Sequence, residues 1–362
     1  MSDTAPKTIP FAVELQDLHV EFIAPGKKIK AVNGVDLKLQ QGEVIALIGE
    51  SGSGKSVMLR TVMRLHNQRS TGITGKLEVN GQDVLGMTSR TLSAMRGKEV
   101  AMIFQEPLLA LDPVYTVGAQ IIESIRRHDG GSRSEAAARA LALFEKVRIP
   151  SPQQRLSAYP HEMSGGMRQR AMIALALACN PKVLLADEPT TALDATVQIQ
   201  ILLLLRDLQR DLGLSVIFVT HDIGAAVEVA DRIAVMYAGR IVEEGTARDL
   251  ILTPRHPYTI ALLKSRAAGA MARGVRLDTI GGAPPDLSAL PPGCAFAARC
   301  TLATGACRAA QPPSIEVALG HHVRCIHTDQ AAAIAPVPHT PTSPVMPVTP
   351  IDKLWADDPL GV

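Results

Sequence analysis

Residues 44–56 read VIALIGESGSGKS, in which the apolar run Val44–Ile48 leads directly into a glycine-rich loop. Five consecutive apolar residues are typical of a strand that is buried on both faces of a parallel sheet. The loop fits the pattern G-x-x-x-x-G-K-[ST], and a helical pattern from Lys55 to His66 follows it. A strand, such a loop and a helix in this order predict a P-loop, which binds the phosphates of a nucleotide.

The residues of this loop suit the binding of ATP and Mg²⁺. Glycines allow the backbone to wrap closely round phosphates, and successive N–H groups at a helix N-terminus favour negative charge. We predict that Lys55 reaches the β- and γ-phosphates and that the hydroxyl of Ser56 is a ligand of Mg²⁺. The residues predicted to bind ATP here are Gly49, Glu50, Ser51, Gly52, Ser53, Gly54, Lys55 and Ser56.

A second apolar run, Val183 to Ala186, ends in two carboxylates, Asp187 and Glu188. Taken alone, such a pair is more often a solvated strand end. Beside a P-loop, however, the first carboxylate can hold Mg²⁺ and the second can polarise a water that attacks the γ-phosphate. We therefore predict that Asp187 is a nucleotide and Mg²⁺ ligand and that Glu188 is catalytic.

From about residue 13 to about residue 265, the chain alternates short apolar runs with longer helical patterns. Apolar runs recur at Val100 to Phe104 and at Val216 to Val219, and helical patterns lie at 134–147, 167–179 and 195–212. Strands that alternate with helices predict an α/β domain with a largely parallel sheet. The mostly helical stretch 90–180 interrupts this rhythm, and we interpret it as a helical subdomain.

Composition excludes several other classes of protein. The 362 residues carry a formal net charge of +2 and only 3% aromatic residues, so a histone-like polyanion binder and a base-stacking nucleic-acid platform are both disfavoured. We expect no nucleic-acid partner.

The sequence shows no membrane span and no secretory signal. The longest apolar run, Ala171 to Cys179, is far below the ~20 residues of a spanning helix. Residues 1–10 lack the pattern of a secretory signal, so we expect a cytosolic location.

Further motifs carry a resemblance to a known family. The segment Tyr159 to Arg170, YPHEMSGGMRQR, resembles the signature motif of the ATP-binding cassette (ABC) ATPases. Gln105 resembles the glutamine of that family's Q-loop, Asp194 the aspartate of its D-loop, and His221 its switch histidine. These motifs stand in the family's order and spacing, and the resemblance covers about residues 13–326.

The resemblance implies a fold and a mechanism. It implies a P-loop NTPase (ABC ATPase) core with a helical subdomain and an antiparallel β part, plus a small cysteine-rich C-terminal extension. Two cassettes would meet head to tail, so that each signature motif contacts the partner's ATP. Gln105 would sense Mg²⁺ and the attacking water, His221 the γ-phosphate, and Asp194 would signal across the dimer. Phe22 would stack on adenine, the alternative being a core phenylalanine. The signature residues are Ser164, Gly165, Gly166 and Met167.

The C-terminal third narrows the branch of the family. The segments Pro254 to Thr259 and Leu290 to Cys300 resemble the extension of oligopeptide/dipeptide importer ATPases. This implies import of di- or oligopeptides, with nickel, glutathione or oligosaccharides as alternatives. It also implies a second, similar ATPase in a heterodimer, two membrane permease subunits and, indirectly, an extracytoplasmic peptide-binding protein. The chain would lie peripherally on the cytoplasmic face of a bacterial inner membrane.

Two other classes remain as competing hypotheses. Non-transport ABC ATPases usually carry two cassettes or a coiled-coil insertion, and neither is visible in this sequence. A catalytically dead regulatory cassette is disfavoured because Lys55, Asp187, Glu188 and His221 are all present.

Four of the five cysteines lie close together, with the spacing C-x5-C-x6-C-x17-C. A four-thiolate site supports either a [4Fe–4S] cluster or a structural Zn²⁺, and reduced or disulfide-bonded cysteines are a third alternative. The resemblance favours [4Fe–4S]. Three neighbouring arginines either offset thiolate charge or are solvated, and Cys179 is expected to be a buried small residue. The four cysteines are Cys294, Cys300, Cys307 and Cys325, and the arginines are Arg299, Arg308 and Arg324.

These interpretations divide the chain into four parts. The predicted parts are an N-terminal tail, 1–10; a nucleotide-binding domain, 11–265, with the helical subdomain at about 90–180; a cysteine-rich extension, 266–330; and a proline-rich, flexible tail, 331–362, which holds Trp355.

Overall fold

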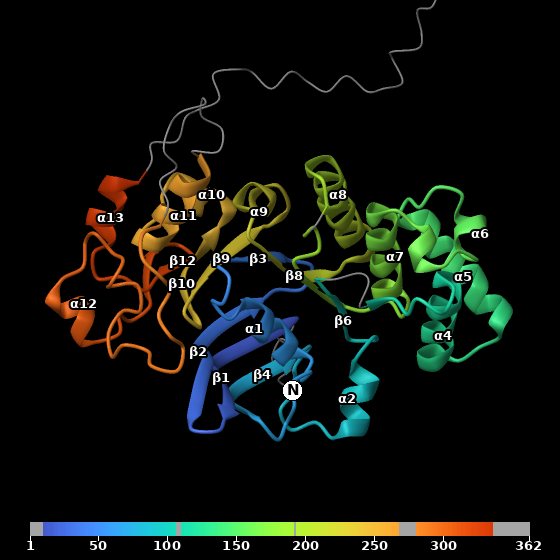
Figure 1. Ribbon diagram of the computed structural model, residues 1–362, viewed down its shortest axis with the longest axis horizontal. Coiled ribbons are helices and arrows are strands. Elements are labelled where there is room, and N and C mark those ends of the chain that lie inside the picture. The colour runs from blue at the N-terminus through green and yellow to red at the C-terminus, as the bar shows by residue number, and fades with distance from the viewer. Residues whose placement is uncertain (1–9, 106–109, 192, 268–279, 336–362) are drawn as a thin grey trace, which may run out of the picture.

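The computed structural model describes residues 10–105, 110–191, 193–267 and 280–335 (Figure 1). The predictions for residues 1–9 and for most of the proline-rich tail, Trp355 included, lie outside these ranges. Among the described residues, no helix is long and apolar enough to cross a membrane.

The centre of the molecule is an eight-stranded sheet with the order β11-β12-β10-β9-β3-β8-β7-β6. The five strands from β9 to β6 are parallel, and the remaining three are antiparallel. The parallel sheet predicted from the alternating pattern is therefore confirmed. Its strands are β3 (Val44–Ile48), β6 (Val100–Ile103), β7 (Val183–Asp187), β8 (Ser215–Thr220), β9 (Arg232–Tyr237), β10 (Arg240–Thr246), β11 (Ile315–Ala318) and β12 (His321–Val323).

Strand β3 is buried on both faces, as its unbroken apolar run predicts. Ile45 and Leu47 point into a core shared with the second sheet, whereas Ala46 and Ile48 point into the core under the helices. Complete burial of each larger side chain contributes roughly 1.5–3 kcal/mol. This strand therefore fixes the start of the glycine-rich loop on a rigid support.

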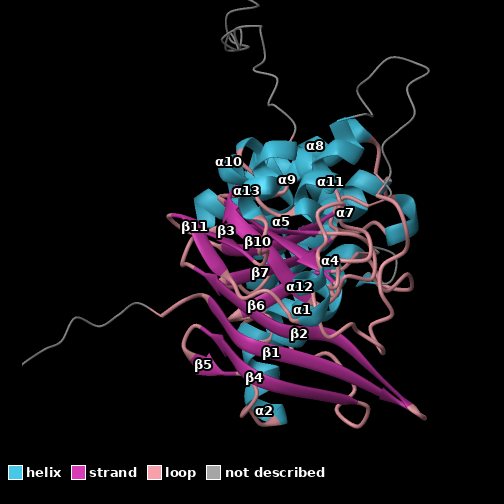
Figure 2. Ribbon diagram, turned by 90° about the vertical axis from the view of Figure 1, so that its left-hand side faces the viewer, coloured by secondary structure: helices cyan, strands magenta, loops and turns pink. Residues whose placement is uncertain are grey.

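A second, antiparallel sheet with the order β2-β1-β4-β5 packs against one face of the core sheet, together with helix α1 (Lys55–Val62). Figure 2 shows β1, β2 and β4 beneath the core strands. Helix α1 ends four residues before the predicted His66, because Arg64 adopts a left-handed conformation that turns the chain away. The strands are β1 (Val13–Ala24), β2 (Lys27–Leu39), β4 (Thr71–Val79) and β5 (Gln82–Asp83).

Helices α4, α5, α6 and α7 form a lobe beyond the β6 edge of the sheet (Figure 1). Helix α7 begins at Gly165, two residues before the predicted start at 167, because the side chain of Ser164 caps it by accepting the N–H of Met167. The helices are α2 (Ser89–Met95), α4 (Val117–Asp129), α5 (Arg133–Lys146), α6 (Pro152–Arg155), the short 3₁₀ turn η1 (Pro160–Glu162), α7 (Gly165–Leu177), α8 (Ala195–Leu212), α9 (Ile223–Val229) and α10 (Ala247–Leu252).

The C-terminal segment, which comprises the described residues 257–267 and 280–335, lies at the opposite end of the molecule and joins the core sheet (Figure 1). Strand β12 pairs with β10, with Val323 opposite Glu243, and β11 pairs with β12 in turn. Residues 331–334, which the sequence placed in the tail, continue a helix. The helices of this segment are α11 (Pro257–Ala267), α12 (Gly305–Ala309) and α13 (Thr328–Ile334).

Candidate nucleotide-binding site

Two glycines allow the loop between β3 and α1 to turn where it does. Gly49 has a φ of 153°, and a Cβ there would lie 2.2 Å from the carbonyl oxygen of Met236. Gly54 has a φ of 105°, and a Cβ there would lie 2.2 Å from the carbonyl oxygen of Ala31. Any other residue would force the backbone apart at both positions. The glycines of the motif are therefore required by packing as well as by phosphate binding.

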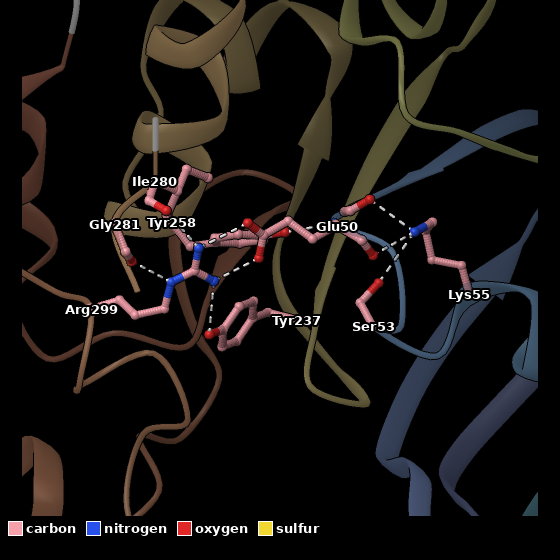
Figure 3. Close-up of polar contacts among 9 residues, drawn as sticks. Glu50, Ser53, Lys55, Tyr237, Tyr258, Ile280, Gly281 and Arg299 are labelled. Atoms are coloured by element: carbon pink, nitrogen blue, oxygen red, sulfur yellow. Dashed lines mark hydrogen bonds and ion pairs between the residues drawn. The ribbon is translucent and has the colours of Figure 1, made fainter. Parts of the chain in front are cut away.

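Lys55 folds back over the loop. Its ammonium group donates to the carbonyl oxygens of Gly49 and Glu50, at 2.8 Å each, and to the hydroxyl of Ser53 at 3.3 Å (Figure 3). The side chain is 5% exposed, and this burial lowers its pKa, although nearby carboxylates oppose the shift. The lysine is thus held at the loop, where phosphate oxygens can replace its carbonyl partners.

A cavity of about 370 Å³ lies over the loop. Most of the residues that are predicted to bind the nucleotide line this cavity. Phe22, which is predicted to stack on adenine, forms part of its wall. Phe22 is packed edge-on against His66, with ring centroids 5.3 Å apart. The residues that line the cavity are Phe22, Ile29, Ala31, Ser51, Gly52, Gly54, Lys55, Ser56, Val57, Gln105, Glu188 and Leu287.

Asp187 lies at the end of β7, directly beneath Ser56. Its Oδ1 accepts a hydrogen bond of 2.6 Å from the Ser56 hydroxyl, whereas its Oδ2 is buried and accepts none, with Arg60 3.5 Å away. Burial is the main cause of the raised pKa of this carboxyl group. A buried carboxylate oxygen without a donor, next to a hydroxyl, fits a hard divalent cation such as Mg²⁺.

Glu188 is the centre of a small polar cluster at the carboxyl ends of the strands. Its Oε2 accepts hydrogen bonds from the Thr191 hydroxyl at 2.8 Å and from the Gln105 amide at 3.2 Å. His221 Nδ1 lies 3.7 Å from the same oxygen. The structure therefore brings together the three residues that the sequence predicts to be catalytic, and adds Thr191.

The signature residues and Asp194 lie apart from this cavity, and none of them lines it. Ser164 caps α7, and Asp194 caps α8 by accepting the N–H of Val197 at 3.0 Å. Gly166 lies against Val197, since a Cβ there would be 3.0 Å from its methyl group. Both motifs thus lie at helix N-termini, where Ser164 and Asp194 are exposed.

The four C-terminal cysteines line one cavity of about 20 Å³, together with His256 and His327. All four are free thiols. Burial raises the pKa of three of them, to about 11 for Cys325. In the described ranges, no group of three or more His, Cys, Asp or Glu side chains is arranged to hold a metal ion. As expected, Cys179 is buried, and it lies against Ser124.

Sequence reasoning missed several contributors to the site. Leu287, from the C-terminal segment, reaches the cavity wall, and its carbonyl accepts the N–H of Lys30 at 3.0 Å. Arg299 was expected either to offset thiolate charge or to be solvated, but its guanidinium is buried against Glu50. Both contacts join residues more than 240 positions apart, so no local pattern could reveal them. Thr191 and Arg60, by contrast, are near motifs that the sequence already marks.

Comparison with known proteins shows the family of the chain. The family model described as ABC transporter matches residues 32–191, and the model described as oligopeptide/dipeptide transporter, C-terminal region, matches residues 242–307. The oligopeptide transport ATP-binding protein OppD of Bacillus subtilis is 45% identical over 320 residues, which are 88% of this chain and 89% of OppD. The dipeptide transport ATP-binding protein DppD of the same organism is 44% identical over 321 residues, which are 88% of this chain and 96% of DppD.

A solved structure shows the same fold. The ATP-binding cassette MJ0796, in a dimeric post-hydrolysis state with ADP and Pi, is 30% identical and superposes with a TM-score of 0.59, covering 65% of this chain and 99% of that one. The nucleotide cavity, the long matches to two relatives and the match of residues 242–307 agree with one another. The chain therefore belongs to the ABC transporter ATP-binding family, in the branch that carries the oligopeptide/dipeptide transporter C-terminal region.

Proposed function

We propose that this protein binds and hydrolyses ATP to power the import of di- or oligopeptides through a membrane ABC transporter. The observation that carries the proposal is the cavity over the P-loop, where Glu188, Gln105 and His221 converge beside Lys55 and Ser56. Relatives named for peptide transport, and a C-terminal region typical of such transporters, support the substrate class.

In the proposed reaction, the loop N–H groups and Lys55 bind the phosphates of ATP. Ser56 and Asp187 would hold Mg²⁺ with Gln105, and the ion when bound neutralises charge on the phosphate oxygens. Glu188 orients the attacking water and accepts its proton, while Gln105 and Thr191 hold the carboxylate in place. His221, which is 61% exposed, is free to turn toward the γ-phosphate.

We propose further that a second, similar ATPase completes each site. The signature residues lie outside the chain's own cavity and at the N-terminus of α7, where N–H groups favour a phosphate. A head-to-tail heterodimer would place Ser164, Gly165, Gly166 and Met167 against the partner's ATP, and Asp194 at the contact between cassettes.

The remaining partners follow from the transport role. We propose two permease subunits in the membrane, with this chain bound peripherally at the cytoplasmic face of a bacterial inner membrane, and an extracytoplasmic binding protein that delivers the peptide. We propose that residues 106–113, which follow Gln105, receive a helix of the permease; residues 106–109 of this stretch lie outside the described ranges.

The test is purification of the tagged chain from its native membranes in mild detergent, followed by identification of its subunits. The complex is then placed in vesicles with ATP and a labelled dipeptide. Peptide uptake that is lost in the Glu188→Gln complex supports the proposal. ATP-driven uptake of nickel, glutathione or an oligosaccharide instead would replace the substrate class, and the absence of any membrane subunit would refute the transport role.

We also propose that the four cysteines hold a [4Fe–4S] cluster, with a single Zn²⁺ as the alternative. Support comes from the donor set, since four thiols surround one small cavity. The thiols as described are not grouped for a metal, so binding requires Cys294, Cys300, Cys307 and Cys325 to approach one another.

The test of this centre is anaerobic purification with assays for iron, labile sulfide and zinc. Four irons per chain, lost in Cys300→Ser and kept in Cys179→Ser, support the cluster. One zinc per chain supports the alternative, and protein without either metal refutes both.

A further inference from the structure

Arg299 is a buried cation whose hydrogen-bonding groups are fully used. Its side chain is 4% exposed. The two terminal nitrogens donate to both carboxylate oxygens of Glu50, at 2.6 and 2.9 Å, and one of them also donates to the Tyr237 hydroxyl at 3.2 Å. The remaining donors reach the carbonyl oxygens of Ile280 and Gly281, at 3.1 and 2.8 Å (Figure 3). All five N–H donors of the guanidinium therefore have an acceptor.

Glu50, the second residue of the P-loop, is held equally completely. Its carboxylate binds Arg299, its N–H donates to the Tyr258 hydroxyl at 2.8 Å, and its carbonyl oxygen accepts from Lys55 at 2.8 Å. Tyr258 lies in α11, so two of these three contacts come from residues after 250. Although the sequence placed Glu50 among the ATP ligands, its carboxylate points away from the nucleotide cavity, toward the C-terminal segment (Figure 3).

The pair is specific in its chemistry. A planar guanidinium matches a carboxylate in a two-pronged contact that a lysine cannot reproduce. Arg299 is buried and Glu50 is partly buried, so removal of either partner leaves a poorly solvated charge without its counter-charge, which is unfavourable. Loss of Arg299 would therefore drive Glu50 toward solvent, and the P-loop backbone on either side of it would have to move.

Arg299 also connects the P-loop to the four-cysteine cavity. It precedes Cys300 in the chain, and its guanidinium carbon lies 5.8 Å from the ring centroids of both Phe296 and Tyr237. Phe296 and Cys300 both line the cysteine cavity. Arg299 thus lies between the wall of the cysteine cavity and the carboxylate of Glu50 in the P-loop.

We propose that Arg299 is a positioning residue of the nucleotide site, which fixes the P-loop through Glu50 and so makes ATP affinity depend on the conformation of residues 280–300 of the C-terminal segment. The inference rests on ATP binding by this chain. It needs no particular occupant of the cysteine cavity, and it holds for any transported substrate.

The test compares Arg299→Met with the control Arg308→Met in the full-length protein. Methionine keeps the buried length of the side chain and removes the charge, and Arg308 is an exposed arginine of the same segment. With a fluorescent ATP analogue, we expect the Kd of Arg299→Met to rise about tenfold, a loss of about 1.4 kcal/mol, and that of the control to stay unchanged. At saturating ATP, kcat should remain within about twofold, because Arg299 does not line the cavity.

A double-mutant cycle identifies the route of the effect. If Arg299 acts through Glu50, then Glu50→Gln alone should weaken ATP binding similarly, and the double variant should be no weaker than either single one. Additive losses would overturn the proposal. So would an unchanged Kd in a folded Arg299→Met protein with a lowered Tm, because that result would assign Arg299 a purely structural role.

A second variant covers the case in which Arg299→Met does not fold. Arg299→Lys keeps the charge but loses the two-pronged contact, so we expect a folded protein with an intermediate Kd. Wild-type affinity in Arg299→Lys would contradict the proposal. ATP hydrolysis by the wild-type protein reports on the proposed function separately, since it persists even if Arg299 plays no part.

Discussion

Glu188 adopts a left-handed backbone conformation, with a φ of 47°, which is uncommon for a residue with a long side chain. Such strain persists only where the surroundings impose it. Here the N–H of Glu188 donates to the carbonyl oxygen of Val219 at 3.1 Å, and its carboxylate is held by Thr191 and Gln105. These contacts hold the strained backbone of Glu188 in place, and this conformation directs its carboxylate, at the end of β7, to the position where an attacking water would lie.

We predict that Glu188→Gln abolishes turnover and retains ATP binding. The amide keeps the shape of the side chain and its contact with Thr191 but cannot accept a proton, so a loss of at least about a hundredfold in kcat is expected. In the assembled transporter, the variant should accumulate a closed, ATP-bound cassette dimer. Steady-state hydrolysis and size-exclusion chromatography with ATP provide the measurements, and normal hydrolysis would disprove the assignment.

His256 gives a prediction about pH. Complete burial lowers its pKa to about 4, against an opposing effect of Glu243, and its Nδ1 accepts the N–H of Tyr258 at 3.0 Å. The folded protein therefore holds a neutral imidazole. As the pH falls from 6.5 to 4, the unfolded chain gains a proton that the folded chain excludes, so stability is lost over this window, by up to about 3 kcal/mol.

The measurement is urea unfolding of the wild type and of His256→Asn at several pH values. Asparagine keeps an acceptor for the Tyr258 N–H and does not titrate. The difference in free energy of unfolding between the two proteins should shrink as the pH falls from 6.5 to 4. A difference that does not vary with pH would show that His256 is not the responsible group.

At the scale of elements, a buried side-chain pair reinforces the backbone pairing of β12 with β10. His321 Nε2 lies 2.8 Å from Glu243 Oε1, and both side chains are almost fully buried. The same carboxylate accepts the N–H groups of Arg255 and His256, at 2.6 and 3.0 Å. Glu243 thus fastens both β12 and the start of α11 to the core sheet.

We expect His321→Ala to lower the free energy of unfolding by about 2 kcal/mol, because a buried carboxylate loses a partner. The neighbouring His322→Ala is the matched control, since His322 is exposed on the same strand and should tolerate the change. Thermal unfolding of the two variants side by side tests this. Equal effects would show that the buried pair does not stabilise the strand.

Some elements could be predicted from the sequence and others could not, for identifiable reasons. Val44–Ile48 and Ala195–Leu212 have the predicted bounds, because an unbroken apolar run and a long amphipathic pattern are strong local signals. Strands β11 and β12 escaped notice because they are short and are held by pairing with a distant strand. These two strands form because β10 offers a pairing edge, and their own residues carry no pattern that predicts them.

At the scale of the whole molecule, the proposed head-to-tail arrangement leads to a prediction about Gly165. A Cβ there would lie 3.5 Å from the nearest side-chain atom, an ordinary contact, so a larger residue fits the free subunit. Gly165→Glu would place a negative charge where the partner's γ-phosphate is expected. We predict an unchanged Kd for the chain's own ATP and a loss of at least about tenfold in hydrolysis by the assembled transporter.

Gly305→Glu is the control for this prediction. Gly305 is also the first residue of a helix, and nothing lies within 4 Å of a Cβ there. Its hydrolysis rate should equal that of the wild type. Full activity of the Gly165→Glu transporter would contradict the head-to-tail arrangement, whereas weaker ATP binding by the isolated chain would place Gly165 in its own site.

The nucleotide site was largely predictable because its residues lie in contiguous motifs that the P-loop fold requires. The fold brings Gln105, Glu188 and His221 together because each follows a parallel strand of the same sheet, and the carboxyl ends of such strands meet at one edge. The connection to the C-terminal segment was not predictable, because Arg299 and Glu50 are 249 positions apart and each is unremarkable in its local context.

The buried pairs that join the C-terminal segment to the rest of the chain constrain how the sequence can change over evolutionary time. Arg299 with Glu50, and His321 with Glu243, each link a position after 290 to one before 250. A substitution at one member leaves a buried or partly buried polar group without its partner, so it should be tolerated best when its partner changes too. We therefore expect the C-terminal segment and the part of the chain before residue 250 to evolve together, and each pair to covary among relatives.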